Sequence, residues 1–171
     1  MFHITADLQV TDADRIEAHL LRLSPEDRSM RFAAGVVTDE TIRRYVARMR
    51  IGHDLVLGLV SQRGLLFGLA HGCVFERDGQ PFVEAAFSVD AAWRGLGLGK
   101  ALMAALQRRA GERATERVAL VGMCAPRNWP MRRVFERAGL VVQREEHEMH
   151  ARGWVLPSRL AEGLALPQPG R

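Results

Sequence analysis

The sequence predicts a mixed α/β domain in which helices come first, a series of strands follows, and strands and helices then alternate. Apolar residues recur at helical spacing up to residue 49, and apolar runs of strand length replace them from residue 54 onward. A segment with three closely spaced glycines, residues 95–99, separates one strand-like run from a leucine-rich helical run. Glycines packed so densely before a helix indicate a backbone turn with a special conformation or a close ligand.

Length and composition predict one domain. A chain of 171 residues can bury a full hydrophobic core, and 47% hydrophobic with 26% charged residues is ordinary for a globular protein. We expect residues 1–155 to form this domain and residues 156–171, which end in proline and glycine, to form a flexible tail. No apolar run has the length of a membrane span, and the N-terminus lacks the pattern of a signal peptide, so we expect a cytoplasmic protein that binds no membrane.

Positive charge is carried almost entirely by arginine. The formal net charge is +4, and Lys100 is the sole lysine. Arginine binds planar anions through two parallel hydrogen bonds, which favours phosphate or carboxylate ligands, although a biased composition with a solvated basic surface explains the same excess. Aromatic residues make up only 6% of the chain, so nucleic acid is not an expected partner. Cys73 and Cys124 lie in apolar runs and are expected to be reduced core thiols.

Three helices are expected before residue 50, each with its own start signal. The pattern Thr11-x-x-Asp14 resembles a capping box, Ser24-Pro25 places a capping serine before a proline, and Thr38 or Asp39 begins the third helix. The buried stripe of the third helix is Ile42, Tyr45, Val46 and Met49.

Strands and two further helices follow. The expected strands are residues 54–60, 65–75, 81–89, 118–124 and 140–149. Asp78-Gly79 predicts a hairpin turn between the second and third of these strands. One helix is expected over residues 97–113, and another begins near Asn128 and ends at Gly139. The apolar stripe of the last helix is Met131, Val134, Phe135 and Ala138.

The glycine-rich segment fails two familiar phosphate motifs. A dinucleotide fingerprint requires glycine where Lys100 or Leu102 stands, and a Walker loop requires glycine at Arg94 and a hydroxyl residue at Ala101. A glycine-rich turn that opens a helix nevertheless presents backbone N–H groups without partners and a dipole that favours an anion. With Arg94 and Lys100 on either side, the turn is predicted to hold a phosphate or pyrophosphate.

Arg94-Gly95-Leu96-Gly97-Leu98-Gly99 resembles the Q/R-x-x-G-x-G/A acyl-CoA signature of the GNAT superfamily of N-acetyltransferases. The stretch "APRNWPMRRVFERAGL" resembles the second motif of that family, and "LSPEDRSMRF" resembles the first helices of bacterial members that acetylate lysine. The resemblance implies a mostly antiparallel central sheet flanked by helices, with acetyl-CoA bound at a strand–turn–helix site. It also implies transfer of the acetyl group to a primary amine that attacks the thioester directly.

The resemblance implies a set of cofactor-binding residues. Backbone N–H groups of the turn would bind the CoA pyrophosphate, here Arg94, Gly95, Leu96, Gly97, Leu98, Gly99 and Lys100. The pantetheine arm would pair with the end of the preceding strand, here Phe87, Ser88 and Val89, and the N–H of Val89 would stabilise the oxyanion. Asn128 matches an asparagine that contacts the CoA arm; a helix cap alone is the alternative, and capping and contact are compatible.

Three residues bear on proton transfer. Glu84 stands ten residues before Arg94, the place of the general base in lysine-acetylating members, although an outward-facing role in the strand is an alternative. Asp90 is the second candidate for the general base. Many relatives carry a tyrosine where this chain has Phe135, and that tyrosine protonates the departing thiolate. A thiolate whose conjugate acid has a pKa of about 8.5 departs without much help, so transfer without a dedicated acid is expected.

Several alternatives remain open from the sequence. Because Phe135 cannot act as an acid, it favours a second hypothesis, in which the protein is a regulatory module that binds acyl-CoA without turnover. His71 and Cys73 alternate in one strand, but the residue order of a metal site or a cysteine–histidine nucleophile is missing, and no metal is expected. The acceptor is either a small-molecule amine or a protein lysine, and a homodimer is allowed.

Overall fold

The computed structural model describes residues 4–159, and a seven-stranded sheet forms its centre. The strands lie in the order β1-β2-β3-β4-β5-β7-β6, and all neighbours are antiparallel except β4 and β5. The strands are β1 (Ile4–Asp7), β2 (Leu55–Val60), β3 (Leu66–Arg77), β4 (Gln80–Val89), β5 (Val118–Cys124), β6 (Val141–Glu145) and β7 (Glu148–Val155). This sheet confirms the mixed α/β fold that the sequence predicts.

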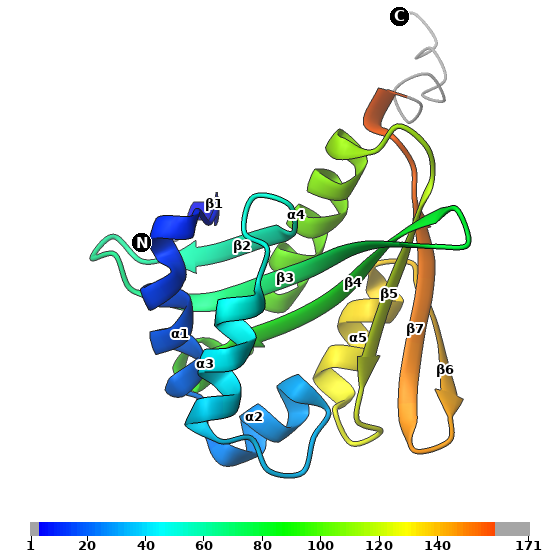
Figure 1. Ribbon diagram of the computed structural model, residues 1–171. Coiled ribbons are helices and arrows are strands. Elements are labelled where there is room, and N and C mark those ends of the chain that lie inside the picture. The colour runs from blue at the N-terminus through cyan, green and yellow to red at the C-terminus, as the bar shows by residue number, and fades with distance from the viewer. Residues whose placement is uncertain (1–3, 160–171) are drawn as a thin grey trace, which may run out of the picture.

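Helices cover both faces of the sheet. They are α1 (Ala13–Leu21), α2 (Pro25–Phe32), α3 (Asp39–Arg48), α4 (Leu98–Arg113) and α5 (Trp129–Arg137), with 3-10 turns η1 (Val10–Asp12) and η2 (Ala91–Trp93). Figure 1 shows α1 and α3 on one side of the strands and α4 on the other. Two apolar cores result, one containing Leu102, Leu106 and Phe135, the other Ile16 and Ile42. Alternation of side chains along each strand lets one sheet close both cores.

The helix starts follow the sequence except at the first helix. The Oγ atoms of Ser24 and Thr38 each accept a backbone N–H from three residues onward, at 3.1 and 3.2 Å, as predicted. The expected capping box at Thr11–Asp14 is wrong. A 3-10 turn precedes α1, and the carboxylate of Asp12 accepts the N–H of Gln9 at 2.9 Å, so the cap lies earlier in the chain.

Turn chemistry explains which strands were predicted well. Asp78 and Gly79 have φ angles of 53° and 72°, which confirms the predicted hairpin turn between β3 and β4. The single strand expected over residues 140–149 is wrong, because β6 and β7 form a hairpin there. Its turn contains Glu146 at a φ of 52°, where glycine or asparagine would have signalled the turn. The short strand β1 was not expected from the sequence.

The pairing of β4 with β5 stops early. These strands are joined in register only at Phe82–Ala119, Val83–Leu120 and Glu84–Val121. Beyond Glu84, β4 continues to pair with β3 as far as Val89, and β5 continues to pair with β7 as far as Cys124. The two halves of the sheet therefore diverge, and the edge of β4 from Ala85 onward is left without a strand beside it.

The end of the described chain packs onto the domain. Arg159 donates from Nη2 to the carbonyl of Thr115 at 2.7 Å, and Pro157 is buried. These contacts place residues 156–159 against the region that follows α4, and residues 160–171 of the predicted tail lie outside the described residues. Of the helices between residues 4 and 159, none has the length and apolar character needed to cross a bilayer.

Candidate active site

A cleft of about 910 Å³ opens where β4 and β5 diverge. Its walls come from α2, the end of β4, the glycine-rich turn, the end of β5 and the start of α5. Figure 1 shows α2 and α5 near the ends of these strands, on the side of the sheet where β4 runs into the turn. The cleft brings together ten of the predicted site residues, Phe87, Ser88, Val89, Arg94, Gly95, Gly97, Leu98, Gly99, Lys100 and Asn128. Leu96 and Glu84 do not line it.

The open edge of β4 directs backbone donors into the gap. Asp90 donates its N–H to the carbonyl of Phe67 at 2.9 Å, which fixes the phase of the regular antiparallel ladder between β3 and β4. In such a ladder every second residue turns its N–H and C=O away from the partner strand. The N–H groups of Phe87 and Val89 therefore point away from β3, toward the side that β5 has left. A thin, extended ligand fits there as an added strand.

Ser88 lies between these two residues and faces the other way. Its hydroxyl is 2.8 Å from Nε2 of His19, a fully buried side chain of α1. The other ring nitrogen of His19 lies 3.0 Å from Asp90 Oδ1, although the orientation is poor for a hydrogen bond. Arg22 also pairs with Asp90, at 2.9 Å. The Ser88 side chain thus ties β4 to α1.

The glycine-rich turn has the conformation that its sequence demands. Gly95 and Gly97 have φ angles of 78° and 76°, in the left-handed region that other residues rarely adopt. A side chain at either position would meet no atom within 4 Å, so backbone conformation, rather than crowding by this chain, requires glycine. Gly97 is the N-cap of α4, and the first N–H groups of that helix face the cleft entrance without intrahelical acceptors.

Arg94 braces the turn. Its Nη2 lies 2.8 Å from Asp27 Oδ2 on α2, and its Nε donates to the carbonyl of Val89 at 3.1 Å. Burial opposes ionisation of Asp27, but hydrogen bonds from Arg94 and Ser24 outweigh it and lower the pKa of Asp27. The Asp27–Arg94 pair therefore links α2, the end of β4 and the turn at neutral pH.

Comparison with known proteins places this geometry in a family. Residues 20–140 match the model of the acetyltransferase (GNAT) family. The chain belongs to the GNAT family. Among curated proteins, no significant sequence match is found. The GNAT domain of S. lividans PAT has a similar structure, with a TM-score of 0.72 and 23% identity over 89% of this chain and 90% of that one.

Two further GNAT structures show the same fold. A phosphinothricin acetyltransferase from Sinorhizobium meliloti, in complex with AcCoA, has a TM-score of 0.68 and 14% identity, covering 100% of this chain and 95% of its own. The ribosomal-protein-S5-alanine acetyltransferase from Vibrio fischeri has a TM-score of 0.65 and 13% identity, covering 92% and 94%. At these identities the likeness concerns the fold.

The cleft fits the acetyl-CoA that the GNAT family uses. Helix N–H groups at Gly97 suit a pyrophosphate, and the N–H groups at the β4 edge suit the amide-bearing arm. Six basic side chains line the cleft against two acidic ones, and one of those acids, Asp27, is already paired. The basic residues are Arg31, Arg94, Lys100, Arg127, Arg133 and Arg137, and the acidic residues are Glu26 and Asp27.

Asn128 and Phe135 both lie at the cleft. Asn128 Oδ1 accepts the N–H of Met131 at 3.2 Å, so this oxygen caps α5 and its amide NH₂ group is left for other partners. Phe135 is 1% exposed and packs in the core beside α4. The predicted apolar stripe on α5 is confirmed, since Met131, Val134 and Ala138 pack against the same core.

The two carboxylates considered as bases occupy different surroundings. Glu84 is exposed on the β4 face opposite α4, level with Cys73 on β3, next to cleft-lining Ala85. Burial opposes ionisation of Asp90, but the nearby His19 ring and the Arg22 guanidinium outweigh it and lower the pKa of Asp90. Asp90 is therefore a weak base that holds α1 to the sheet.

Sequence reasoning missed the contribution of α2 and of a buried network behind it. Met30 and Arg31 line the cleft from α2. Their positions in the sequence indicate a helix but do not indicate that this helix borders a cleft. Arg31 Nη2 donates to Tyr45 Oη at 2.7 Å, and Tyr45 Oη lies 2.6 Å from His71 Nδ1. His71 Nε2 in turn lies 3.2 Å from Asp54 Oδ2.

The electrostatics of this network fix its proton arrangement. Burial lowers the pKa of His71, the nearby charges of Arg31 and Arg50 lower it further, and Asp54 opposes them. Burial would raise the pKa of Asp54, but its hydrogen bonds, chiefly from Val74 N–H and His71, lower it on balance. An ionised Asp54 beside a neutral histidine accepts the Nε2 proton, so Nδ1 accepts the hydroxyl proton of Tyr45.

The cysteines are poor candidates for nucleophiles. Burial raises the pKa of Cys124, which lines the cleft, to about 11, and burial also raises the pKa of Cys73. Both thiols are therefore protonated at neutral pH. No group of three or more side chains suited to hold a metal ion occurs among residues 4–159.

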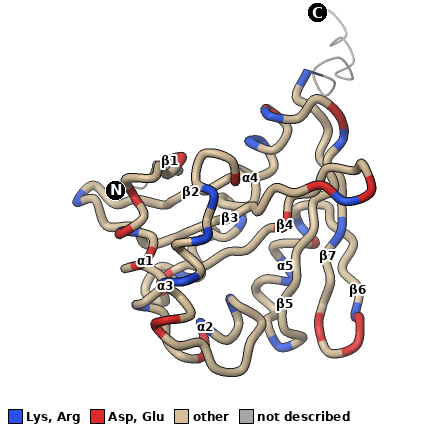
Figure 2. Tube along the Cα trace, in the orientation of Figure 1, with Lys and Arg blue, Asp and Glu red and all other residues tan. Residues whose placement is uncertain are grey.

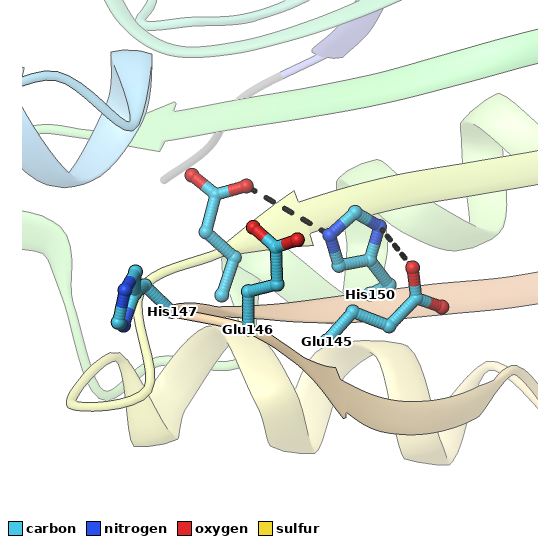
Figure 3. Close-up of a pocket in the computed structure, with 5 residues that line it drawn as sticks. Glu145, Glu146, His147 and His150 are labelled. Atoms are coloured by element: carbon cyan, nitrogen blue, oxygen red, sulfur yellow. Dashed lines mark ion pairs between the residues drawn. The ribbon is translucent and has the colours of Figure 1, made fainter.

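A second hollow lies apart from this cleft, at the turn between β6 and β7. Figure 3 shows Glu145, Glu146, His147 and His150 around it, with His150 paired to Glu145 and to Glu148 at 3.6 and 3.8 Å. Figure 2 shows this acidic turn apart from the loop between β5 and α5, whose one charged residue, Arg127, is basic. The acidic turn lines no part of the cleft.

Proposed function

We propose that the protein is an acetyl-CoA-dependent N-acetyltransferase in which a neutral primary amine attacks the thioester directly. The main support for this proposal is the open edge of β4, whose free backbone N–H groups are followed in the chain by the glycine-rich turn and the N-cap of α4. Bound acetyl-CoA supplies an acetyl group activated as a thioester. The residues of the chain bind it, orient it and move protons around it.

Backbone groups of the turn would hold the pyrophosphate, from Arg94 to Lys100. Phe87, Ser88 and Val89 would line the arm, with the amides of Phe87 and Val89 as donors, because Ser88 turns its own toward β3. The N–H of Val89 is proposed to stabilise the oxyanion, as a backbone donor that the β3–β4 ladder holds in place. The Asn128 side chain would contact the arm through its NH₂ group while its oxygen caps α5.

Glu84 is proposed as the general base. An amine with a pKa near 10.4 must lose its proton before attack, at a cost of about 4–5 kcal/mol at neutral pH. The carboxylate of Glu84 is exposed and lies beyond the cleft wall, next to Ala85 and Ala86, which line it. Proton transfer through a water molecule is consistent with that position.

Release of CoA from acetyl-CoA, measured with a panel of amines, tests the proposal. We expect turnover that requires an amine and yields an N-acetylated product detectable by mass spectrometry. Tight binding of acetyl-CoA with no turnover on any small amine or lysine peptide would instead favour a regulatory acyl-CoA-binding module. The buried Phe135, which supplies no acid, is the feature that fits that second function.

A further inference from the structure

Arg31 brings a positive charge to the cleft without a carboxylate beside it. Neighbouring arginines are neutralised, since Arg28 pairs with Asp39 at 2.7 Å and Arg94 with Asp27 at 2.8 Å. Within residues 4–159, no acidic side chain forms an ion pair with Arg31, and its buried Nε has no hydrogen-bond partner. A buried N–H donor without an acceptor is costly unless a bound group completes it, and an anion is the group that a guanidinium prefers.

The guanidinium is held firmly in place. Its Nη2 donates to Tyr45 Oη, and its Cζ lies 5.1 and 5.3 Å from the ring centroids of Phe32 and Tyr45. Tyr45 in turn donates to His71, which donates to Asp54. Asp54 is 3% exposed and His71 is 7% exposed, so the chain of hydrogen bonds runs through the interior. The carboxylate in this chain of hydrogen bonds, Asp54, is therefore separated from Arg31 by two side chains. The guanidinium is held in position and can still attract an anion.

Arg31 lies at the end of the cleft away from the pyrophosphate turn. Its partner Tyr45 contacts His71, which stands in register with Ala86 on β4. Ala86 precedes Val89 by three residues, which is about 10 Å along a strand, on the side opposite the turn. On α2, Asp27 marks the turn, and Arg31 lies four residues, or about 6 Å, further along the helix. The phosphates of CoA therefore belong to the turn, and Arg31 faces the acceptor.

We propose that Arg31 binds a carboxylate of the acceptor, so that the substrate is a small amine carrying a carboxylate, as in an amino acid. This inference rests on the proposed transferase function and assigns its substrate class. A planar guanidinium matches a carboxylate through parallel N–H bonds, whereas a protein lysine presents a cationic side chain without a nearby carboxylate. Tyr45, His71 and Asp54 are positioning residues that hold Arg31.

Kinetics with paired acceptors test this assignment. Each free amino acid is compared with its carboxamide, which keeps the amine and removes the negative charge. We expect the native protein to prefer the free acid, and Arg31→Gln to raise KM for the acid by about 10- to 100-fold, the range of a charge-assisted contact. The KM for the carboxamide and the affinity for acetyl-CoA should change little. Arg31→Lys should recover part of the loss, because it restores the charge without the planar fork.

Two further variants separate positioning from folding. Tyr45→Phe removes the hydrogen bond to Arg31 and should raise KM for the acid with little change in kcat. Arg48→Gln, at an exposed position of α3, removes one positive charge outside the cleft and should leave KM unchanged. Calorimetric titration of the N-acetylated product into the native protein and Arg31→Gln gives a binding readout independent of turnover, and only the native protein should bind it well.

Each outcome decides the matter. Equal use of acid and carboxamide, with no response to Arg31→Gln, overturns the assignment of Arg31 while leaving the transferase function intact. Activity confined to lysine within a polypeptide also overturns it. If no amine is acetylated although acetyl-CoA binds, the proposed function fails and the acceptor assignment fails with it. Should Arg31→Gln not fold, Arg31→Lys and Tyr45→Phe carry the comparison.

Discussion

Phe135 packs against Gly122 so closely that no side chain fits between them. A methyl group on Gly122 would lie 2.6 Å from Phe135 Cζ and 3.2 Å from the carbonyl oxygen of Ala85. Gly122 follows Val121, the last residue of β5 that pairs with β4. The missing side chain therefore lets α5 settle against the point at which the two halves of the sheet separate.

The substitution Gly122→Ala should destabilise the fold by about 1–3 kcal/mol, because the ring must move or the strand must shift in an overpacked core. Chemical denaturation followed by circular dichroism measures the effect. Gly35→Ala is the matched control, since a methyl group there would meet no atom within 4 Å. Equal stability of the two variants would contradict the close packing described above.

Phe135→Tyr should change kcat by only a few-fold, because a thiolate leaves without a dedicated acid. Phe135→Ala should instead cost about 3–5 kcal/mol of stability, since the ring is buried. Steady-state kinetics and thermal unfolding measure the two effects. A rise in kcat of about a hundredfold in Phe135→Tyr, the size expected of general acid catalysis, would show that the native protein lacks an acid it needs.

Gly97→Asp should weaken acetyl-CoA binding by placing a negative side chain at the N-cap of α4 and straining a backbone at a φ of 76°. Isothermal titration calorimetry measures the affinity. Gly64→Asp is a strict control, because Gly64 has a φ of 79°, lies in the open, and does not line the cleft. Both variants should lose similar stability, but only Gly97→Asp should lose affinity. A parallel loss of affinity in both would assign the effect to unfolding.

Glu84→Gln should lower kcat by about a hundredfold or more at neutral pH while acetyl-CoA affinity stays the same, as for loss of a general base. The deficit should shrink as the pH approaches the pKa of the amine, because solvent then removes the proton. Glu76→Gln, an exposed glutamate on neighbouring β3, controls for charge. A deficit that is constant with pH would mean that Glu84 orients the acceptor or supports the strand.

The buried His71 should make stability depend on pH. Its pKa is lowered in the folded state, so below the unfolded value of about 6.5 the unfolded chain binds a proton that the folded protein resists. Stability should therefore fall as the pH drops below that value, until the folded pKa is reached. His71→Gln should flatten this part of the profile in urea titrations, and His147→Gln, on the exposed β6–β7 turn, should not. An unchanged slope in His71→Gln would contradict the argument.

The elements that sequence reasoning located were those with strong local signals. Ser24 and Thr38 are residue types that commonly cap helices, and Asp78-Gly79 is typical of a tight turn. Gly95 and Gly97 favour the left-handed backbone that they adopt. The β6–β7 turn was missed because its left-handed residue is Glu146, which carries no such signal. Local chemistry was sufficient only where the residue type was unambiguous.

The candidate site also contains residues that local sequence signals predict and residues that only the fold brings together. Two nearby segments, residues 87–89 and 94–100, were predicted together, and all of their residues except Leu96 line one cleft. Arg31 was missed because its role depends on Tyr45, His71 and Asp54, which lie far from it in the chain and meet only through the fold. Strand alternation alone also left the direction of the Glu84 side chain open, and the structure places it in solvent.

The early end of the β4–β5 pairing has a mechanical consequence. Three registered pairs and the helices packed behind them hold the two halves of the sheet together, and past these pairs β4 has no strand on its β5 side. A ligand arm bound there would hydrogen-bond to the backbone of β4 and so restrict motion between the two halves of the sheet. Part of the binding free energy is then spent on restricting motion at the three β4–β5 pairs, so a more mobile junction should bind the ligand more weakly. Changes at this junction, far from any atom of the ligand, should tune its affinity.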